Sequence, residues 1–257
     1  FFYRLLEKLK GHSSEEICPL KMALISDVHG IEAALRAVLD HARERGVTAI
    51  LHAGDAVGAP RPDQSIELLR GADVLSVYGN LDQTLMVGHR TGKHTGDQQL
   101  DLVMGNMKDR SWEWLANLPQ EVRLDVCGRT VYMTHGSPGD VGEKLLPSTP
   151  DDHLKAIARK VNADVVIIGH THLPMCREVA RTMFVNPGSV GRPRDGPEAS
   201  YAILEFPSLE LKHHRVRYDV ERTLKEVSSQ GLSDLAEAIE KGRNGDRTTT
   251  VGRWAMT

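Results

Sequence analysis

Three short apolar segments in the first third of the chain each end beside a glycine and a polar side chain. The segments are residues 22–26, 47–53 and 73–78, and the polar side chains that follow them are Asp27, Asp55 and Asn80. Apolar residues at helical spacing lie between the first two segments, and a shorter helical pattern lies between the second and the third. This strand–helix–strand rhythm predicts an α/β fold with parallel strands, whose carboxyl ends form the usual binding edge.

The second half of the chain repeats this placement with histidines. An expected hairpin at 122–134 leads into His135, and the buried strand expected at 165–168 leads into His170 and His172. The side chains near these strand ends that can bind metal are Asp27, His29, Asp55, Asn80, His135, His170 and His172. Carboxylates, an amide oxygen and neutral imidazoles suit Mn²⁺, Fe or Zn²⁺. Two such ions roughly 3.5–4 Å apart form a recurring device for hydrolysing phosphate esters.

The spacing of these residues supports a shared site. Asp27 and His29 are two residues apart, as are His170 and His172, and alternate residues of an extended chain point to the same side. Both members of a pair can therefore reach one ion. Asp55 carries two carboxylate oxygens, so it can bridge two ions.

In order and spacing, these blocks resemble the calcineurin-like metallophosphoesterase superfamily over about residues 22–206, and they are most similar to its small bacterial and archaeal phosphodiesterases. The turn Asn186-Pro187-Gly188-Ser189 is part of that likeness. The resemblance implies a four-layer α/β/β/α sandwich of two mixed sheets, with a dimetal site at the strand ends. It also implies two divalent metal ions per chain, with Mn²⁺ as the expected working ion and Fe, Ni or Zn²⁺ as alternatives after purification.

The resemblance further implies how the seven ligands divide between the ions. One ion would be held by Asp27, His29, Asp55 and His172. The other would be held by Asp55, Asn80, His135 and His170, so that Asp55 bridges the two. A metal-bridging hydroxide would then attack the phosphorus, and the residues expected to be catalytic are Asp55, Asn80 and His135.

One block departs from the family pattern and bears on the substrate. Many phosphatases of the family have a histidine directly after the asparagine, where this chain has Leu81. Leucine cannot protonate a leaving group, so a general-acid contribution of roughly 10²–10⁴-fold is missing at that position. We therefore predict hydrolysis of small phosphodiesters, such as a cyclic nucleotide or a dinucleotide, in preference to alkyl monoesters.

Two other functions stay open. One is a phosphomonoesterase or protein phosphatase whose acid comes from a cap-like insertion at residues 83–118, through His89 or His94. The other is a non-catalytic binding scaffold on the same fold.

The chain also offers candidate substrate-binding residues. Arg192 and Arg194 follow the Asn-Pro-Gly-Ser turn, and the paired N–H groups of a guanidinium suit phosphate oxygens. Both arginines are therefore candidates, together with His89 and His94.

The regions that flank the expected catalytic domain at 22–206 differ from it in character. Residues 1–21 are interpreted as an N-terminal extension, and residues 207–257 are predicted to form a C-terminal helical appendage. That appendage carries an apolar stripe made by Leu224, Val227, Leu232, Leu235 and Ile239. The stripe predicts either packing within the chain or a homo-oligomer contact between two copies.

Charge and hydropathy exclude several classes of partner. A net charge of −3 indicates neither a basic surface for binding a nucleic-acid polymer nor a polybasic surface for binding a membrane. No apolar stretch approaches the roughly 18 residues of a membrane span. The first residues lack the basic and long apolar regions of a signal peptide, so we expect a cytoplasmic enzyme that acts on a small phosphoester.

Overall fold

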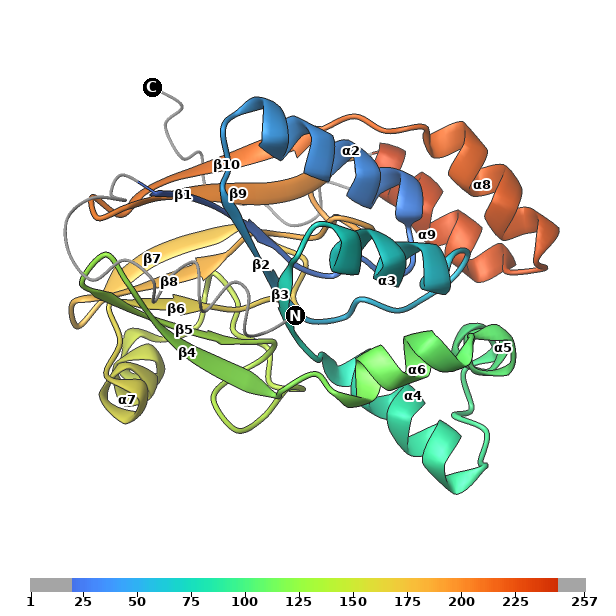
Figure 1. Ribbon diagram of the computed structural model, residues 1–257, viewed down its shortest axis with the longest axis horizontal. Helices are drawn as coiled ribbons and strands as arrows, with labels where there is room; N and C mark the ends of the chain where they lie inside the picture. The colour runs from blue at the N-terminus through green and yellow to red at the C-terminus, as the bar shows by residue number, and fades with distance from the viewer. Residues whose placement is uncertain (1–19, 245–257) are drawn as a thin grey trace.

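The computed structural model describes residues 20–244, and these residues form two five-stranded sheets packed face to face (Figure 1). The strands of the first sheet are β1 (Leu20–Ile25), β2 (Ala49–Ala53), β3 (Leu75–Val77), β9 (Ala199–Phe206) and β10 (Glu210–Val216). The strands of the second sheet are β4 (Glu121–Val126), β5 (Arg129–Thr134), β6 (Val165–Ile167), β7 (Met175–Val179) and β8 (Thr182–Asn186). The strand orders are β10-β9-β1-β2-β3 and β4-β5-β6-β8-β7, and both sheets mix parallel with antiparallel pairs.

Helices cover the outer faces of both sheets and complete a four-layer α/β/β/α sandwich, so the fold prediction is confirmed (Figure 1). The helices on the side of the first sheet are α2 (Glu32–Glu44), α3 (Pro62–Gly71), α8 (Val220–Ser229) and α9 (Ser233–Asn244). Helix α7 (Asp151–Val161) covers the second sheet. Three further helices, which we call the cap, lie to one side of the sandwich (Figure 1). The cap helices are α4 (Asn80–Thr91), α5 (Gln98–Asn106) and α6 (Asp109–Ala116).

Strand β1 shows why the apolar runs become central strands. Met22 and Leu24 point into the core between the two sheets, while Ala23 and Ile25 pack beneath the helices, and all four side chains are fully buried. A strand that is buried on both faces needs a continuous apolar run. The edge strand β4, by contrast, alternates exposed and buried residues, because only one of its faces is covered.

The parallel strands bring the polar blocks of both halves to one end of the sandwich. Strands β1, β2 and β3 are parallel to one another, and so are β5, β6 and β8. The carboxyl ends of parallel strands meet at one sheet edge, so the loops that follow them converge. Backbone hydrogen bonds join these loops: the Asp27 amide donates to the Gly54 carbonyl at 3.0 Å, and the Gly169 amide donates to the His135 carbonyl at 2.8 Å.

The C-terminal region, predicted as a helical appendage over residues 207–257, begins with a strand. Residues Glu210–Val216 form β10, which pairs antiparallel with β9 at the edge of the first sheet. Most β10 side chains are polar and only partly buried, so backbone pairing rather than a clear hydrophobic pattern places this strand. The predicted helices follow as α8 and α9, and residues 245–257 lie outside the described residues.

The apolar stripe of the two C-terminal helices is buried within the chain. Its five side chains are at most 9% exposed, and they belong to the core that the helices form with the first sheet. Packing within the chain therefore accounts for the stripe, and a homo-oligomer contact through these helices stays a prediction.

The N-terminal boundary differs slightly from the predicted one. Residues 1–19 of the predicted extension lie outside the described residues, and its last two residues, Leu20 and Lys21, begin β1. Within residues 20–244, no helix has both the length and the apolar content needed to cross a membrane.

A bidentate ion pair joins α8 to the loop before α3. Nε and Nη2 of Arg61 each lie 2.7 Å from a carboxylate oxygen of Glu226, and Nε2 of Gln230 donates to the Pro60 carbonyl at 3.0 Å. The Arg61 amide also donates to the carbonyl of Gly30 at 3.1 Å. The C-terminal helix thus supports the loop that follows β1.

We expect Glu226→Gln to lower the free energy of unfolding by about 1 kcal/mol, because a half-exposed bidentate pair contributes less than a buried one. Urea unfolding of the variant and the parent protein measures this difference. Glu240→Gln removes the same charge from an exposed position on α9 and should change stability by less than about 0.5 kcal/mol. Glu226 also accepts a hydrogen bond from Nε of Arg222 at 3.0 Å. Equal losses in the two variants would therefore show that net charge, and not the contacts of Glu226 with the two arginines, is responsible.

Candidate metal centre

All seven predicted ligand residues follow the carboxyl ends of five strands, six of them in loops and Asn80 as the first residue of helix α4, so the fold brings them together from distant parts of the sequence. Asp27 and His29 follow β1, Asp55 follows β2, Asn80 follows β3, His135 follows β5, and His170 and His172 follow β6. Five of the seven supply donor atoms to two compact groups that share one carboxylate, Asp27.

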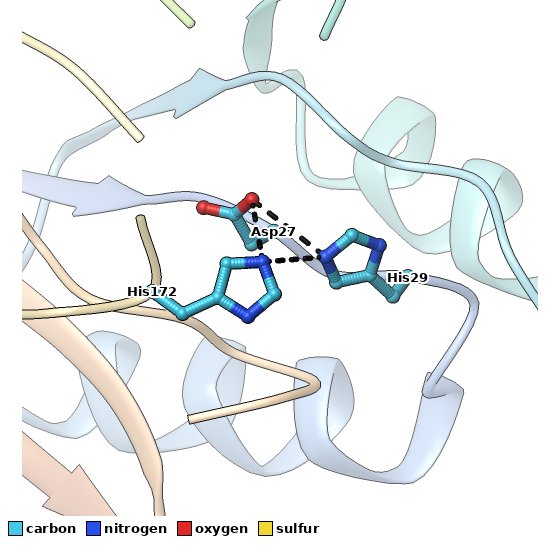
Figure 2. A group of neighbouring side chains, drawn as sticks. All are labelled: Asp27, His29 and His172. Carbon is cyan, nitrogen blue, oxygen red and sulfur yellow. Dashed lines mark hydrogen bonds and ion pairs between the residues drawn. The ribbon is translucent and has the colours of Figure 1, made fainter. Parts of the chain in front are cut away.

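The first group contains Asp27, His29 and His172, whose side chains converge in Figure 2. Oδ1 of Asp27 lies 3.2 Å from Nε2 of His172 and 3.6 Å from Nε2 of His29, and the two Nε2 atoms are 2.9 Å apart. Two nitrogen ligands about 2.1 Å from one ion, at right angles to each other, would be roughly 3 Å apart. The spacing of the first group therefore fits a single cation.

The carboxylate of Asp27 is the member of this group that most needs a cation. Its Oδ2 accepts hydrogen bonds from Oγ of Ser26 at 2.6 Å and from the amide of His170 at 3.1 Å, but its buried Oδ1 has no donor within the described residues. Burial by itself would raise the pKa of Asp27, but the nearby imidazoles, His172 foremost, outweigh burial and hold that pKa well below its usual range. An ionised, buried oxygen without a donor is costly unless a cation binds it.

The second group contains Asp27, Asp55 and His135, with Asn80 beside it. Nε2 of His135 lies 3.1 Å from Oδ1 of Asn80, 3.4 Å from Oδ2 of Asp55 and 3.9 Å from Oδ1 of Asp27. The carboxylate common to both groups is thus Asp27, whereas the sequence predicts Asp55 as the bridge. Oδ1 of Asp55 accepts a hydrogen bond from the amide of Leu81 at 2.9 Å.

Hydrogen bonds to backbone carbonyls orient two of the imidazoles. Nδ1 of His135 lies 2.6 Å from the Ala53 carbonyl, and Nδ1 of His172 lies 2.7 Å from the Arg192 carbonyl. A carbonyl oxygen only accepts, so Nδ1 carries a proton in both rings. Nε2 of each ring is then the nitrogen that is available to a metal ion, and in both residues it faces the clustered carboxylates.

His170 belongs to neither compact group, although it lies beside the second one. Its ring centroid is 5.2 Å from that of His135, and its Nε2 lies 3.0 Å from the Gly142 carbonyl. That carbonyl requires a proton on Nε2, so Nδ1 is the ring nitrogen left for a ligand bond. Burial and the neighbouring His135 lower the pKa of His170, which favours the neutral ring that a metal ion needs.

The backbone at five of the predicted ligands is left-handed, not extended. Asp27, His29, Asp55, His170 and His172 have φ angles between 50° and 66°. Residues other than glycine rarely adopt this conformation, which costs about 1–3 kcal/mol each and is typical of functional sites. The expectation that each pair of ligands shares one side of an extended chain is therefore wrong, because hydrogen bonds between the loops replace strand geometry here. The His29 amide, for example, donates to the Asp55 carbonyl at 3.0 Å.

Asp82 joins the segments around the second group by accepting hydrogen bonds from their backbone amides. Its carboxylate is fully buried and accepts hydrogen bonds from the amides of Ala56, Val57 and Gly79 at 3.2, 3.1 and 2.9 Å. A side chain on Gly79 would place a Cβ atom 2.1 Å from Oδ1 of Asp55, so the backbone passes directly against that carboxylate. Sequence analysis missed Asp82, whose only signal is its place two residues after the predicted asparagine ligand.

The Asn-Pro-Gly-Ser turn braces the loop that carries the last two histidines. Nδ2 of Asn186 donates to the Gly169 carbonyl at 2.7 Å and to Oγ1 of Thr171 at 3.1 Å. Oγ of Ser189 donates to the backbone carbonyl of Asp27 at 2.9 Å. The turn therefore positions ligands from both halves of the chain. The sequence marks this turn only through the family resemblance, because its hydrogen-bond partners are distant in sequence.

The two cap histidines, His89 and His94, have partners inside the cap. The ring of His89 stacks on Trp112 with a centroid distance of 4.0 Å, and Nδ1 of His94 lies 3.2 Å from the Asp101 carboxylate. Within residues 20–244, neither histidine is hydrogen bonded to a predicted metal ligand. The structure therefore does not bring them into the two groups.

The two predicted substrate-binding arginines have different surroundings. Arg194 is exposed, with no hydrogen bond or ion pair to any described residue. Arg192 is partly buried, and its positive charge, after burial, is the next largest cause that lowers the pKa of His29. Of the two arginines, Arg192 is therefore the one within electrostatic reach of the metal ligands.

We expect cation binding to release a proton from His135. Burial by itself would lower the pKa of His135, but the carboxylates of Asp55 and Asp27 outweigh burial and raise the pKa to about 10. At pH 7.5 a cation must displace that proton from Nε2, so affinity should rise with pH up to about 10, by at most about tenfold per pH unit. The same raised pKa stabilises the chelator-treated protein below about pH 6.5, and this contribution is lost as the pH rises through 10.

Isothermal titration calorimetry with Mn²⁺ in buffers of different ionisation enthalpy measures the number of protons released. A release of about one proton at pH 7.5 is expected. Binding without proton release, and with an affinity that does not change between pH 7 and 9, would contradict a ligand role for His135.

Comparison with known proteins agrees with this geometry. Residues 20–208 match the model of the calcineurin-like phosphoesterase superfamily domain. The chain is 28% identical over 245 residues to an uncharacterised protein of Methanocaldococcus jannaschii, and the alignment covers 86% of this chain and 98% of that protein. It is 27% identical over 192 residues to phosphodiesterase YfcE of Escherichia coli, with 72% of this chain and 88% of YfcE covered.

A solved structure supports the same relationship. The crystal structure of a metallophosphoesterase from Sphaerobacter thermophilus matches with a TM-score of 0.72 at 29% identity, and it covers 87% of this chain and 99% of that chain. The superfamily is metal-dependent, and the two groups of aspartate and histidine donors suit a metal ion. The sequence match over residues 20–208 and the shared fold show that this chain belongs to the calcineurin-like phosphoesterase superfamily.

Proposed function

We propose that this protein is a metal-dependent phosphodiesterase that hydrolyses small phosphodiesters, such as cyclic nucleotides or dinucleotides, at a centre of two divalent cations. The observation that carries the proposal is the pair of buried donor groups around the unpartnered Oδ1 of Asp27. A relative of this chain is named a phosphodiesterase, which agrees with the proposed reaction class.

The seven ligands would divide between the two cations by their place in the fold. Asp27, His29 and His172 would hold one cation, and Asn80, His135 and His170 would hold the other, with Asp55 between them. When bound, the cations supply Lewis-acid polarisation of the phosphoryl group and activation of water. Mn²⁺ is the proposed working ion, although Fe, Ni or Zn²⁺ can occupy the same donors after purification.

The chain's own residues prepare this centre before substrate arrives. The Ala53 and Arg192 carbonyls fix the tautomers of His135 and His172, so their Nε2 atoms face the carboxylates. Asn80 contributes a neutral oxygen, which limits the negative charge of the ligand set. Its amide nitrogen would donate a hydrogen bond to a phosphoryl oxygen as charge grows on that oxygen.

The preference for diesters rests on Leu81. Its side chain is partly buried against the core of the first sheet, and its backbone amide donates a hydrogen bond to Oδ1 of Asp55. A group that could protonate an alkoxide leaving group is therefore missing at this position. The monoesterase alternative requires His89 or His94 to supply that proton, yet both have partners inside the cap.

The first experiment loads the chelator-treated protein with Mn²⁺ and compares bis(p-nitrophenyl) phosphate with glycerol 2-phosphate. We expect diester hydrolysis to be faster, because nitrophenolate leaves without protonation whereas an alkoxide does not. Leu81→His should raise alkyl monoester hydrolysis relative to the diester, by roughly tenfold or more. Leu81→Gln is the matched control, since it adds polarity without a titratable proton.

A substrate ratio that is the same in the parent protein and in Leu81→His would reject the role given to Leu81. Faster monoester hydrolysis that falls on replacing His89 or His94 would favour the monoesterase. Intact metal content without turnover of any phosphoester would favour a binding scaffold.

The bridging role of Asp55 is tested by counting metal ions. If Asp55 bridges, Asp55→Ala should lose both cations, as measured by inductively coupled plasma mass spectrometry after dialysis. Asp27→Ala is the matched comparison, because Asp27 is the carboxylate common to both donor groups. Retention of a cation by Asp55→Ala, together with loss of both by Asp27→Ala, would transfer the bridging role to Asp27.

A further inference from the structure

The backbone of Arg192 is fixed against the first donor group. The amide of Arg192 donates to Oγ of Ser189 at 2.8 Å, and the carbonyl of Arg192 accepts from Nδ1 of His172 at 2.7 Å. The preceding residue, Gly191, donates its amide to the Asp27 carbonyl at 3.0 Å. A Cβ atom on Gly191 would lie 2.1 Å from the carbonyl oxygen of Val28, so the loop runs in direct contact with the ligand loop.

Two nitrogens of the Arg192 guanidinium are shielded from solvent but have no hydrogen-bond partner among the described residues. Both Nε and Nη2 are buried and unpartnered within the described residues. Two other partly buried arginines make side-chain hydrogen bonds: Arg61 pairs with Glu226 through two of them, and Arg177 donates to the carbonyls of Pro147 and Thr149. A buried charged donor without an acceptor costs more than a neutral one, so the Arg192 guanidinium needs an anion.

Nε and Nη2, the two unpartnered nitrogens, lie on the same edge of the guanidinium and can donate hydrogen bonds to two oxygens of one anion. Nε–H and one Nη2–H are parallel on one edge of the guanidinium plane, and this edge matches two oxygens of a phosphate or carboxylate. Rotation about the side-chain bonds of Arg192 lets the guanidinium turn toward a ligand, while the backbone carbonyl of Arg192 keeps its hydrogen bond from His172.

The carboxylates whose charges act on Arg192 belong to the metal ligands and to the start of the cap. Burial lowers the pKa of Arg192 to about 10, opposed by the carboxylates of Asp55, Asp97 and Asp27. Asp97 is the N-cap residue of the cap helix α5, and its side chain accepts a hydrogen bond from the Leu100 amide. When cations neutralise Asp27 and Asp55, Arg192 faces less negative charge, so its affinity for an anionic ligand increases.

We propose that Arg192 binds two phosphoryl oxygens of the substrate through Nε and Nη2, beside the metal centre. This assignment rests on the proposed phosphoesterase function and names the side chain that recognises the anion. The guanidinium would remain charged throughout and would offset negative charge on the phosphoryl oxygens. It would thus supply electrostatic stabilisation at a site where Leu81 cannot supply a proton.

The test measures binding of inorganic phosphate to the Mn²⁺-loaded protein by isothermal titration calorimetry. Arg192→Gln removes the charge and the paired Nε and Nη2 donors, and we expect it to weaken phosphate binding by roughly 10–100-fold. Arg192→Lys keeps the charge but loses the bidentate edge, so a smaller loss of roughly tenfold is expected. Arg194→Gln removes the same charge from the same loop and should change phosphate affinity by less than about twofold.

Each variant is checked for metal content by mass spectrometry and for thermal stability. Unchanged phosphate affinity in Arg192→Gln with intact metal content would overturn the assignment. Equal losses in Arg192→Gln and Arg194→Gln would also overturn it, because the net charge of the loop would then bind the anion. Loss of metal together with phosphate binding in both Arg192 variants would show that Arg192 acts on the metal centre and not on the anion.

Turnover is measured separately with bis(p-nitrophenyl) phosphate, so that failure of the two proposals can be distinguished. Phosphate binding that depends on Arg192, in a protein without turnover, would reject the phosphodiesterase function and retain the anion site. Turnover with phosphate binding that does not depend on Arg192 would reject the anion site and retain the function.

Discussion

The buried, ionised carboxylate of Asp27 is the constraint on which the rest of the structure depends. One of its oxygens is satisfied by Ser26 and by the His170 amide, and the other faces imidazole nitrogens from distant loops without a donor. Burial of such a charge is costly, and a cation removes that cost. Because the carboxylate belongs to both donor groups, loops from the two halves of the sandwich must converge on it.

That convergence is achieved by loops that brace one another, not by the strands themselves. Five of the seven candidate ligands have left-handed backbone conformations that are unfavourable for aspartate and histidine. Hydrogen bonds accepted by Asp82 and donated by Asn186 and Ser189 hold the loops in place. The strain is thus carried by a rigid frame, which suits a site whose donors must be positioned before metal and substrate arrive.

In the proposed function, substrate choice depends on two side chains at the margin of this frame. Leu81 keeps the backbone contact to Asp55 but brings no proton, while Arg192 brings a permanent positive charge that no described residue pairs. A site with fixed charge and without an acid at that position favours esters whose leaving groups depart without protonation. Under this proposal, oxyanion recognition by Arg192 and the missing acid at Leu81 belong to two separate segments of the chain.

The sequence by itself determined the α/β class, the strand–helix order and the identity of the seven candidate ligands, because continuous apolar runs and the polar residues after them are local signals. Strand β10 escaped prediction because its polar side chains carry little pattern, and pairing with β9 places it. Only the tertiary structure decided that Asp27 is common to both donor groups and that Arg192, unlike Arg194, approaches them. These are distances between loops, and hydrogen bonds formed across the sandwich set them.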